Sequence, residues 1–456
     1  MTHCFLRFSV IILIITTVQL SQARSSTCCD DYCYSLDPDR TQSKHFATKT
    51  AYEVIRGSST SQEHVVRHCR PSKFWMLVRH GTRLPGKSDI ESMPPILNDL
   101  RDTILENYAH QKSPKRGRMC PQDLDLLKQW QWDKNITVQY ESFLTDQGWD
   151  DLKSLAMREK DRFSEIFDGH YDEQRYLFRH TKTQRTEASF KAFAEGLFGE
   201  ESLDSISTEP GPNDDVLLKP YDFCPAYTAN KEKIKDPDSE LSKFVRSPLY
   251  TQTLADISTR LGFQHVLTTD QIDAMWNACR FEQAWNLRQP SPWCSVFTKT
   301  HVNVIEYKED LNYYYQNSYG YAMGSNLSCH AMADMMKHMG RKEGEQVVGY
   351  FTHESAIQIF LVALEARKDT EDLRADNYHN MRQRQFVSSD LAPFAANVAV
   401  VRYECDDPVE PVKLKFFLNE KTLKFDWCNR GLCNWSEVAY QYGRFLDGNC
   451  DEMYCR

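Results

Sequence analysis

Features typical of membrane proteins and of nucleic-acid-binding proteins are scarce in this chain. The longest apolar run, Phe8 to Val18, has about 11 residues, fewer than the roughly 20 that a membrane-spanning helix needs. The 456 residues carry a formal net charge of -9, whereas nucleic-acid-binding domains usually carry a basic surface. Internal repeats and low-complexity tracts are also missing. We therefore expect a globular protein without a transmembrane segment and without a nucleic-acid partner.

Patterns of metal ligands are missing as well. No two cysteines have C-x-x-C spacing, and His80 and His353 are not accompanied by paired Asp or Glu residues. Of the 15 cysteines, Cys4 lies in the predicted export signal, which leaves an even 14 for pairing. We therefore expect disulfides in place of a zinc site, and no metal or cofactor. The sequence does not specify the pairing, but two clusters are expected to fix the ends of the chain: Cys28, Cys29, Cys33 and Cys428, Cys433, Cys450, Cys455.

The N-terminal segment is typical of an export signal. Arg7 precedes the apolar run, and Ser21-Gln22-Ala23 offers a cleavage site, so residues 1–23 are predicted to be a signal peptide. A buried N-terminal strand is the alternative interpretation. The last six residues contain neither an anchor tail nor a retrieval tetrapeptide. We expect a secreted or luminal glycoprotein with three candidate N-glycosylation sites, Asn135, Asn326 and Asn434.

Strands that alternate with helices predict an α/β fold. Apolar runs predict strands over 74–78, 176–178, 347–351 and 398–403, and a hairpin over 414–418 and 422–425. Helical spacing predicts helices over 96–108, after an N-cap at Thr145, over 190–197 up to Gly199, over 327–339 and over 357–366. Loops are predicted over 81–95 and 204–238, and residues 241–317 are predicted to be mostly helical.

This order of elements predicts a mostly parallel sheet flanked by helices, with an inserted, mainly helical cap. Residues 24–456 are predicted to form one discontinuous domain. Its core is expected at about 60–95, 145–215 and 325–456, and its cap at about 96–144 and 216–324.

Three of the predicted strands end in charged segments that contain imidazole or guanidinium groups. Arg79 and His80 follow the first, Arg179 ends the second, and His353 with Glu354 follows the third. Ligands of open α/β sheets bind at the carboxyl ends of the strands, so we expect these groups to converge. Guanidinium forks match phosphate oxygens, a histidine can attack phosphorus, and a carboxyl group can protonate the leaving alcohol. The residues therefore predict phosphoryl transfer without a metal, through a phosphohistidine.

Simpler interpretations exist for single residues. Arg79 and Arg83 alone could form a structural ion-pair site, and Arg179 could be a surface arginine. Glu354 could be an acidic residue favoured by a helix N-terminus. Arg185 is predicted to be structural.

Residues 79–85, Arg-His-Gly-Thr-Arg-Leu-Pro, resemble the R-H-G-x-R-x-P signature of the histidine acid phosphatase family. Residues 179–181, 185–189, 353–354 and 391–397 resemble further segments of that family in the same order. The resemblance spans roughly residues 70–450 and is strongest with the multiple inositol polyphosphate phosphatases, which are related to phytases. It implies a phosphoglycerate-mutase-like core.

The resemblance also implies a role for each matched residue. His80 would be the nucleophile, and Glu354 the proton donor. The phosphate would be bound by Arg79, Arg83, Arg179 and His353. Glu354 follows the histidine directly, whereas the inositol polyphosphate branch usually shows H-A-E.

A substrate with several phosphates requires a basic rim around the site. The candidates are Lys87, Lys115, Arg116, Arg118, Arg382 and Arg384. Solvated basic loops are the alternative. A general acid phosphatase acting on phosphotyrosine, lysophospholipid or bisphosphoglycerate is an alternative, and an apolar rim would favour phosphotyrosine or lysophospholipid. A catalytically dead phosphate-binding protein is a third possibility. The oligomeric state is not predicted.

Overall fold

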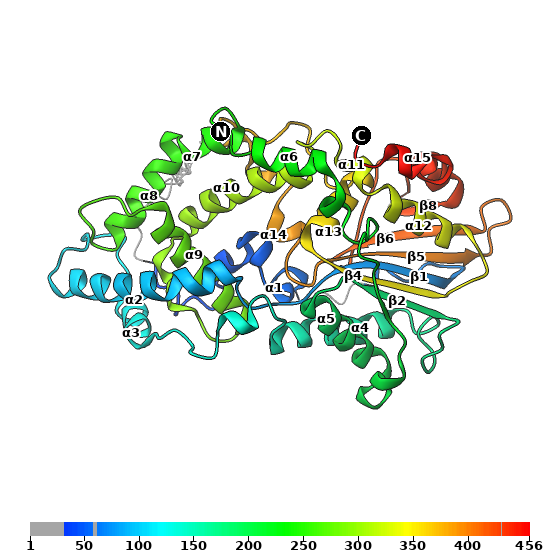
Figure 1. The fold of residues 1–456 in the computed structure, drawn as a ribbon, viewed down its shortest axis with the longest axis horizontal. Helices are drawn as coiled ribbons and strands as arrows, with labels where there is room; N and C mark the ends of the chain where they lie inside the picture. The colour runs from blue at the N-terminus through cyan, green and yellow to red at the C-terminus, as the bar shows by residue number, and fades with distance from the viewer. Residues whose placement is uncertain (1–31, 58–61, 430) are drawn as a thin grey trace, which may run out of the picture.

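A mixed sheet of eight strands lies at the centre of the computed structural model, which describes residues 32–57, 62–429 and 431–456 (Figure 1). Its order is β3-β2-β4-β1-β5-β6-β7, with β8 paired to β6. The strands are β1 Cys69–Arg79, β2 Tyr176–His180, β3 Glu209–Pro210, β4 Val347–Thr352, β5 Asn397–Cys405, β6 Val412–Leu418, β7 Lys421–Thr422 and β8 Leu432–Asn434. The predicted signal peptide, 1–23, and Cys4, Cys28 and Cys29 lie outside the described residues.

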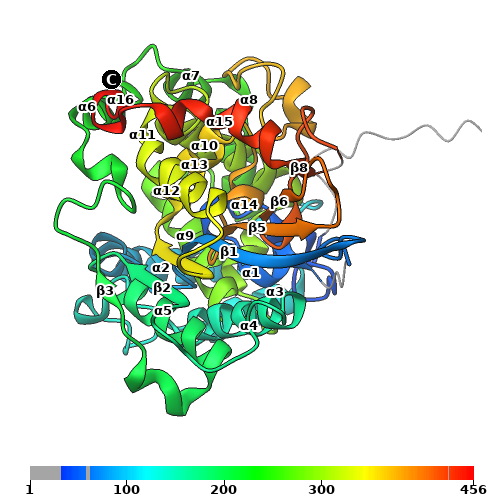
Figure 2. The same cartoon turned by 90° about the vertical axis from the view of Figure 1, so that its right-hand side faces the viewer.

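Helices cover both faces of the sheet. The helices are α1 Tyr52–Arg56, α2 Lys87–Ala109, α3 Pro121–Gln129, α4 Asp146–Arg162, α5 Gln184–Phe198, α6 Pro225–Lys233, α7 Glu240–Val245, α8 Pro248–Arg260, α9 Thr269–Trp285, α10 Lys299–Asn317, α11 Gly324–Leu327, α12 Cys329–Gly340, α13 Glu354–Ala363, α14 Ser388–Leu391, α15 Trp435–Asp447 and α16 Cys450–Met453. Both views place α4 and α5 on one face of the sheet and α12 and α15 on the other (Figures 1 and 2). The helices α2, α3 and α7 to α10 gather beside the sheet (Figure 1). Within the described residues, no helix is both long and apolar enough to cross a bilayer.

Side chains of the central strand β1 alternate between the two faces. Phe74, Met76 and Val78 pack in the core that contains Leu152 of α4 and Phe193 of α5. Trp75 and Leu77 pack in the other core, with residues of α12 and α13. A strand buried on both faces requires a continuous apolar run, as residues 74–78 provide. The same alternation places Arg79, at the end of β1, on the face of α13.

The sheet corrects the prediction of mostly parallel strands. β1, β4, β2 and β3 are parallel neighbours, whereas β5, β6, β7 and β8 are each antiparallel to the strands beside them. For two of these pairs the reason is a short connection: residues 406–411 join β5 to β6, and Asn419 and Glu420 join β6 to β7. A connection this short can join two antiparallel strands, whereas two parallel strands need a crossover of a dozen or more residues.

The predicted helices are largely confirmed, with two corrections. The hydroxyl of Thr145 accepts a hydrogen bond from the backbone of Gly148 at 3.1 Å, which caps α4 as predicted. The loop predicted over 81–95 is wrong beyond Gly86, because α2 begins at Lys87 and contains Pro94 and Pro95. Burial of apolar side chains of α2 outweighs the lost backbone donors. The loop predicted over 204–238 contains α6.

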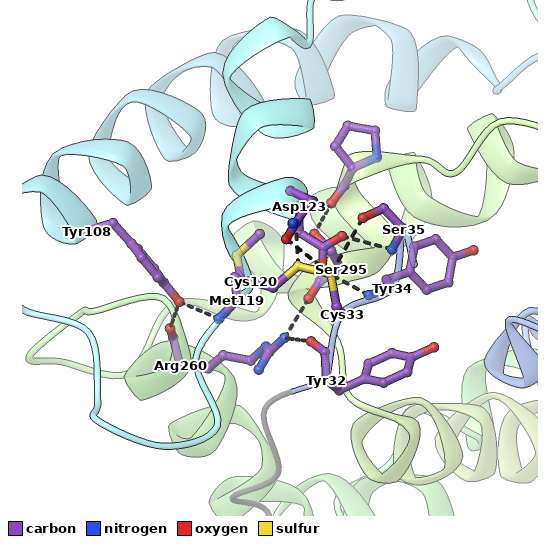
Figure 3. Close-up of a disulfide and its surroundings, with 12 residues drawn as sticks. Tyr32, Cys33, Tyr34, Ser35, Tyr108, Met119, Cys120, Asp123, Arg260 and Ser295 are labelled. Carbon is purple, nitrogen blue, oxygen red and sulfur yellow. Dashed lines mark hydrogen bonds between the residues drawn. A yellow bond between two sulfur atoms is a disulfide. The ribbon is translucent and has the colours of Figure 1, made fainter. Parts of the chain in front are cut away.

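All cysteines of the described residues are paired, as predicted for disulfides. The six pairs are Cys33–Cys120, Cys69–Cys405, Cys224–Cys455, Cys279–Cys294, Cys329–Cys450 and Cys428–Cys433. Asp123 accepts hydrogen bonds from the backbone of Tyr34 and of Ser35, both at 2.9 Å, beside the first disulfide (Figure 3). Cys33, Cys120 and Asp123 cluster as metal ligands do, but both sulfurs are bonded to each other.

Candidate active site

The carboxyl ends of β1 and β4 lie side by side and open into a polar cavity. Arg79 pairs with Thr352 across these parallel strands, so His80 and His353 follow as neighbours, with ring centroids 5.5 Å apart. The cavity has a volume of about 500 Å³. It is lined by His80, Arg83, Thr183, Arg185, Lys219, Tyr221, Asp222, Tyr227, Thr228, Lys231, Glu232, Gln316, His353, Glu354 and Ser355. Four of the six residues predicted from the sequence as the catalytic and phosphate-binding set therefore meet in one cavity.

His80 is buried and is held as one tautomer. Its side chain is 1% exposed, and its Nδ1 lies 2.8 Å from the carbonyl oxygen of Gly81. A carbonyl only accepts hydrogen bonds, so Nδ1 carries the proton and Nε2 keeps a lone pair. Burial, together with the positive charges of Arg79 and Arg185, holds the pKa of His80 well below its usual range. The imidazole is therefore neutral and nucleophilic at Nε2.

The position of His80 depends on two glycines that touch. A Cβ atom on Gly81 would lie 2.3 Å from the carbonyl oxygen of Gly148, at the start of α4. A Cβ atom on Gly148 would lie 2.1 Å from the carbonyl oxygen of Thr82. The buried carboxylate of Asp151 accepts hydrogen bonds from the Thr82 hydroxyl at 2.7 Å and from the Thr82 backbone at 3.2 Å. The loop after β1 is thus fixed on the first turns of α4.

Arg79 is 2% exposed and is held by carbonyl groups from two distant segments. Its Nη1 donates to the carbonyl of Thr48 and, at 2.8 Å, to that of Ala392. Its guanidinium carbon lies 4.7 Å from the ring centroid of Phe394. Burial lowers the pKa of Arg79 to about 10, although the carboxylate of Glu354 opposes this shift. Arg79 therefore remains a cation, as a phosphate ligand must.

A buried charge network on α10 supports these two segments. Asp310 accepts hydrogen bonds from Nε of Arg384 at 2.8 Å and from the backbone of Ser388 at 2.9 Å, just before Ala392. Glu306 lies 2.8 Å from Nδ1 of His45, just before Thr48. Both carboxylates are almost completely buried. Arg384, predicted for the substrate rim, thus belongs to a structural network behind Arg79.

His353 is oriented by Thr181 and Arg185. Its Nε2 lies 3.0 Å from the hydroxyl of Thr181, and its Nδ1 lies 3.3 Å from Nη2 of Arg185. Since a guanidinium only donates, Nδ1 accepts and Nε2 carries the proton. Burial and the charge of Arg185 lower the pKa of His353 to about 3. His353 is therefore a neutral hydrogen-bonding group beside His80.

Glu354 is the first residue of α13 and points toward the cations of the site. Its Oε2 lies 3.8 Å from Nε of Arg79. Burial alone would raise the pKa of Glu354, but Arg79, His353 and Arg83 outweigh it and hold the pKa at about 2. Without substrate the carboxyl group is therefore ionised.

The structure places Arg179 outside the cavity. Arg179 on β2 is registered with Tyr350, two residues before the end of β4, and its Nη2 pairs with Oδ1 of Asp215 at 2.6 Å. It lines a separate pocket with His330 and Asp334. Arg179 does not join the other predicted residues, because its pairing with Tyr350 places it about two residues, or roughly 7 Å, before the end of the sheet.

Arg185 lines the cavity in its place, although the sequence favoured a structural role for it. Arg185 is the second residue of α5, the helix that follows β2. The sequence could have suggested Arg185 through this position, because the first turn of a helix that follows a parallel strand borders the ligand crevice. Burial lowers the pKa of Arg185, and the neighbouring Arg83 lowers it further.

None of the six predicted rim residues is among those that line the described cavity. The loop containing Lys115, Arg116 and Arg118 joins α2 to α3, and exposed Arg382 contacts His379 at 3.3 Å. Lys87 starts α2 and is exposed. The basic groups of the rim are Lys219, which pairs with Asp222, and Lys231 on α6. The sequence did not suggest them because the segment 204–238 looked like a loop.

The assembled site combines anion binding with a neutral nucleophile. Three guanidinium groups, Arg79, Arg83 and Arg185, surround the His80 imidazole closely enough to lower its pKa. Such a group of arginines favours a dianionic ligand, and the carboxyl group of Glu354 lies on the same side. The arrangement can hold a phosphate between an attacking imidazole and an acid.

Comparison with known proteins agrees with this geometry. Residues 73–419 match the family described as the histidine phosphatase superfamily, branch 2. The chain is 41% identical over 448 residues to multiple inositol polyphosphate phosphatase 1 of Drosophila melanogaster, covering 98% of this chain and 93% of that protein. It is 26% identical over 432 residues to the human protein of the same name, covering 89% and 87%.

Solved structures show the same fold. The phytase from D. castellii superimposes with a TM-score of 0.71 at 18% identity, covering 91% of this chain and 87% of that chain. A multiple inositol polyphosphate phosphatase of Bifidobacterium longum, in complex with inositol hexasulfate, gives a TM-score of 0.62 at 11% identity, covering 87% and 96%. From the family match and the near full-length relative, the chain belongs to the histidine phosphatase superfamily, branch 2.

Proposed function

We propose that this protein is a phosphomonoesterase that hydrolyses inositol polyphosphates through a phosphohistidine on His80. The observation that carries the proposal is the convergence of His80, Arg83, Arg185, His353 and Glu354 on one polar cavity at the carboxyl ends of β1 and β4. The names of the relatives support the choice of substrate.

In the first step, Nε2 of His80 attacks phosphorus in line with the leaving oxygen. The N–P bond forms as the P–O bond to the inositol breaks. Glu354, which takes up the proton of the monoanionic phosphate group on binding, passes this proton to the departing oxygen. Arg79, Arg83 and Arg185 neutralise the charge on the equatorial oxygens. The hydrogen bond from Nδ1 to Gly81 stabilises the positive charge that develops on the imidazole.

In the second step, water attacks the phosphohistidine. Glu354, now ionised, takes a proton from this water as the new P–O bond forms and the N–P bond breaks. Neutral His80 and inorganic phosphate result. The scheme uses only side chains of this protein.

The rim supports a polyanionic substrate over a lipid or a phosphotyrosine. An apolar rim would favour phosphotyrosine or lysophospholipid, whereas Lys219, Lys231, Thr228 and Gln316 surround this cavity. The carboxylates Asp222 and Glu232 also line it.

We propose export and a capping role for the helical region. Six disulfides among the described residues fit an oxidising compartment. Asn135 is exposed in a turn and can carry a glycan, whereas the side chain of Asn326 donates to the carbonyl of Arg456 at 2.9 Å and Asn434 precedes α15. The helices within 96–144 and 216–324 would cap the core, since α6 and α10 supply cavity residues.

The test is phosphate release from inositol hexakisphosphate by the purified protein and by His80→Ala, with and without a chelator. We expect chelator-resistant release that disappears in His80→Ala. Nitrophenyl phosphate serves as the simple monoester.

Each other result contradicts part of the proposal. Release from nitrophenyl phosphate alone would indicate a general acid phosphatase. Binding of inositol hexakisphosphate without release from either compound would indicate a phosphate-binding protein. Loss of activity with chelator would reject the mechanism without a metal.

A further inference from the structure

Lys49 is a half-buried cation beside the site. It ends the short 3-10 helix Ala47–Lys49, directly after Thr48, whose carbonyl holds Arg79. Its Nζ lies 5.3 Å from the ring centroid of Phe281, and the guanidinium carbon of Arg83 lies 5.6 Å from the same centroid. Within the described residues, its ammonium group has no hydrogen bond or ion pair, and the side chain is half-buried. Lys49 and Arg83 thus flank one buried aromatic ring.

The charged groups around Lys49 are two cations, Arg83 and Arg280, and two carboxylates, Asp89 and Glu309. Arg280 of α9, which is 3% exposed, pairs with Glu309 of α10 at 3.6 Å, and its Nε has no hydrogen-bond partner in the described part of the chain. Asp89 accepts a hydrogen bond from Asn277 at 3.3 Å. Since these four charges balance around Lys49, the charge of Lys49 itself is left without compensation, and a partly buried, uncompensated charge favours an ion of the opposite sign.

We infer that Lys49, with Arg83 beside it and Arg280 behind it, forms a second anion subsite that binds a phosphate group of the substrate other than the one being cleaved. This inference rests on the proposed hydrolysis of polyphosphorylated substrates. The subsite lies on the α9 side of Arg83, whereas Lys219 and Lys231 lie on the α6 side. Arg83 stands between the nucleophile and the subsite, so a ligand with neighbouring phosphates can engage both.

The subsite depends on pH. Burial, followed by the positive charge of Arg280, lowers the pKa of Lys49 to about 7. Glu309 and Asp89 oppose this shift, and Arg83 adds to it. Lys49 is therefore charged below about pH 7 and loses its charge above it, so a polyanion binds the free protein more weakly in alkaline solution. An arginine at this position would stay charged throughout.

The experiment compares Lys49→Met and Lys49→Arg with the wild type, and uses Lys44→Met as the matched control. Lys44 is an exposed lysine of the same N-terminal segment. Two readouts are used: KM for inositol hexakisphosphate and for nitrophenyl phosphate, and calorimetric binding of inositol hexakissulfate, which cannot be hydrolysed. Both are measured about 1.5 pH units below and above 7, and thermal unfolding confirms that each variant is folded.

We expect Lys49→Met to raise KM for the hexakisphosphate about tenfold more than KM for nitrophenyl phosphate, since a charge-assisted hydrogen bond is lost. The dissociation constant of the hexakissulfate should rise by a similar factor. Lys49→Arg should keep tight binding on the alkaline side, where the wild type weakens. Lys44→Met should change neither constant.

Two results would overturn the inference. One is an equal effect of Lys49→Met on both substrates, which would mean that Lys49 acts through Arg79 or Arg83. The other is an unchanged affinity for the hexakissulfate. The binding measurement separates the two proposals. If the wild type binds the hexakissulfate through Lys49 but releases no phosphate from the hexakisphosphate, only the proposed function is rejected.

Discussion

Nε of Arg79 lies 3.8 Å from Oε2 of Glu354, which joins the end of β1 to the first turn of α13 as one charged pair. The pair explains why the acid of this site is ionised before substrate arrives, despite its burial. A bound phosphate would share the cation with Glu354 and raise the pKa of this carboxyl group. The substrate would thus convert Glu354 from a counter-ion into a proton donor.

Replacing the acid tests this role directly. Glu354→Gln should lower kcat for the hexakisphosphate by about 10² to 10⁴, the usual contribution of a general acid. It should lower kcat for nitrophenyl phosphate much less, because nitrophenolate leaves without a proton. Rapid-quench or steady-state phosphate release measures both. Equal losses would remove Glu354 from the role of acid.

The pH dependence follows from the same pair. With the pKa of Glu354 at about 2 and that of His353 at about 3, the free protein should lose kcat/KM only below about pH 3. Because Glu354 is ionised, the proton for the leaving group must arrive with a monoanionic phosphate. An alkyl phosphate loses this proton near pH 6, so kcat/KM should fall above about 6.

A pH series with glycerol 2-phosphate measures this profile. Activity after return to about pH 5 controls for acid unfolding. In Glu354→Gln the decrease of kcat/KM above about pH 6 should be smaller, because this variant has no carboxylate that must take up the proton of the substrate. An acidic limb near the unperturbed value of about 4.3 would show that Arg79 does not act on Glu354 as described.

Arg185 and Arg179 make a matched pair of substitutions. Arg185→Gln should lower kcat/KM for nitrophenyl phosphate by about 10² to 10³, because a preorganised donor to the transferring phosphate is lost. Arg179→Gln should lower it much less and should lower the melting temperature, because Asp215 loses a partner at 2.6 Å. Steady-state kinetics and thermal unfolding distinguish the two. A larger kinetic loss for Arg179→Gln would restore the assignment made from the sequence.

The contact of two glycines predicts a stability effect. Gly81→Ala should lower the free energy of unfolding by about 1–3 kcal/mol, the usual cost of overpacking. It should also lower kcat, because His80 is the preceding residue. Gly86→Ala is the control in the same loop, because a Cβ atom on Gly86 would lie 3.9 Å from Oγ of Ser142, an ordinary contact distance. Chemical denaturation measures both, and equal stabilities of the two variants would contradict the contact.

Local sequence patterns sufficed for the elements and for much of the site. The apolar run 74–78 predicted a strand buried on both faces, and Thr145 predicted the cap of α4, because these features depend on neighbouring residues. His80, Arg83, His353 and Glu354 were found because each directly or closely follows a predicted strand. A strand end fixes the place of the residues after it.

Tertiary structure alone decided which of the remaining charged residues belong to the site. Arg179 stops short because β2 is registered with Tyr350, and Arg384 is buried by Asp310 of α10. Lys219 and Lys231 line the cavity but come from segments whose local sequence shows no ligand pattern. The reason is physical: strand and helix formation follow short-range periodicity, whereas the convergence of charged side chains depends on register and packing between segments that lie far apart in the chain.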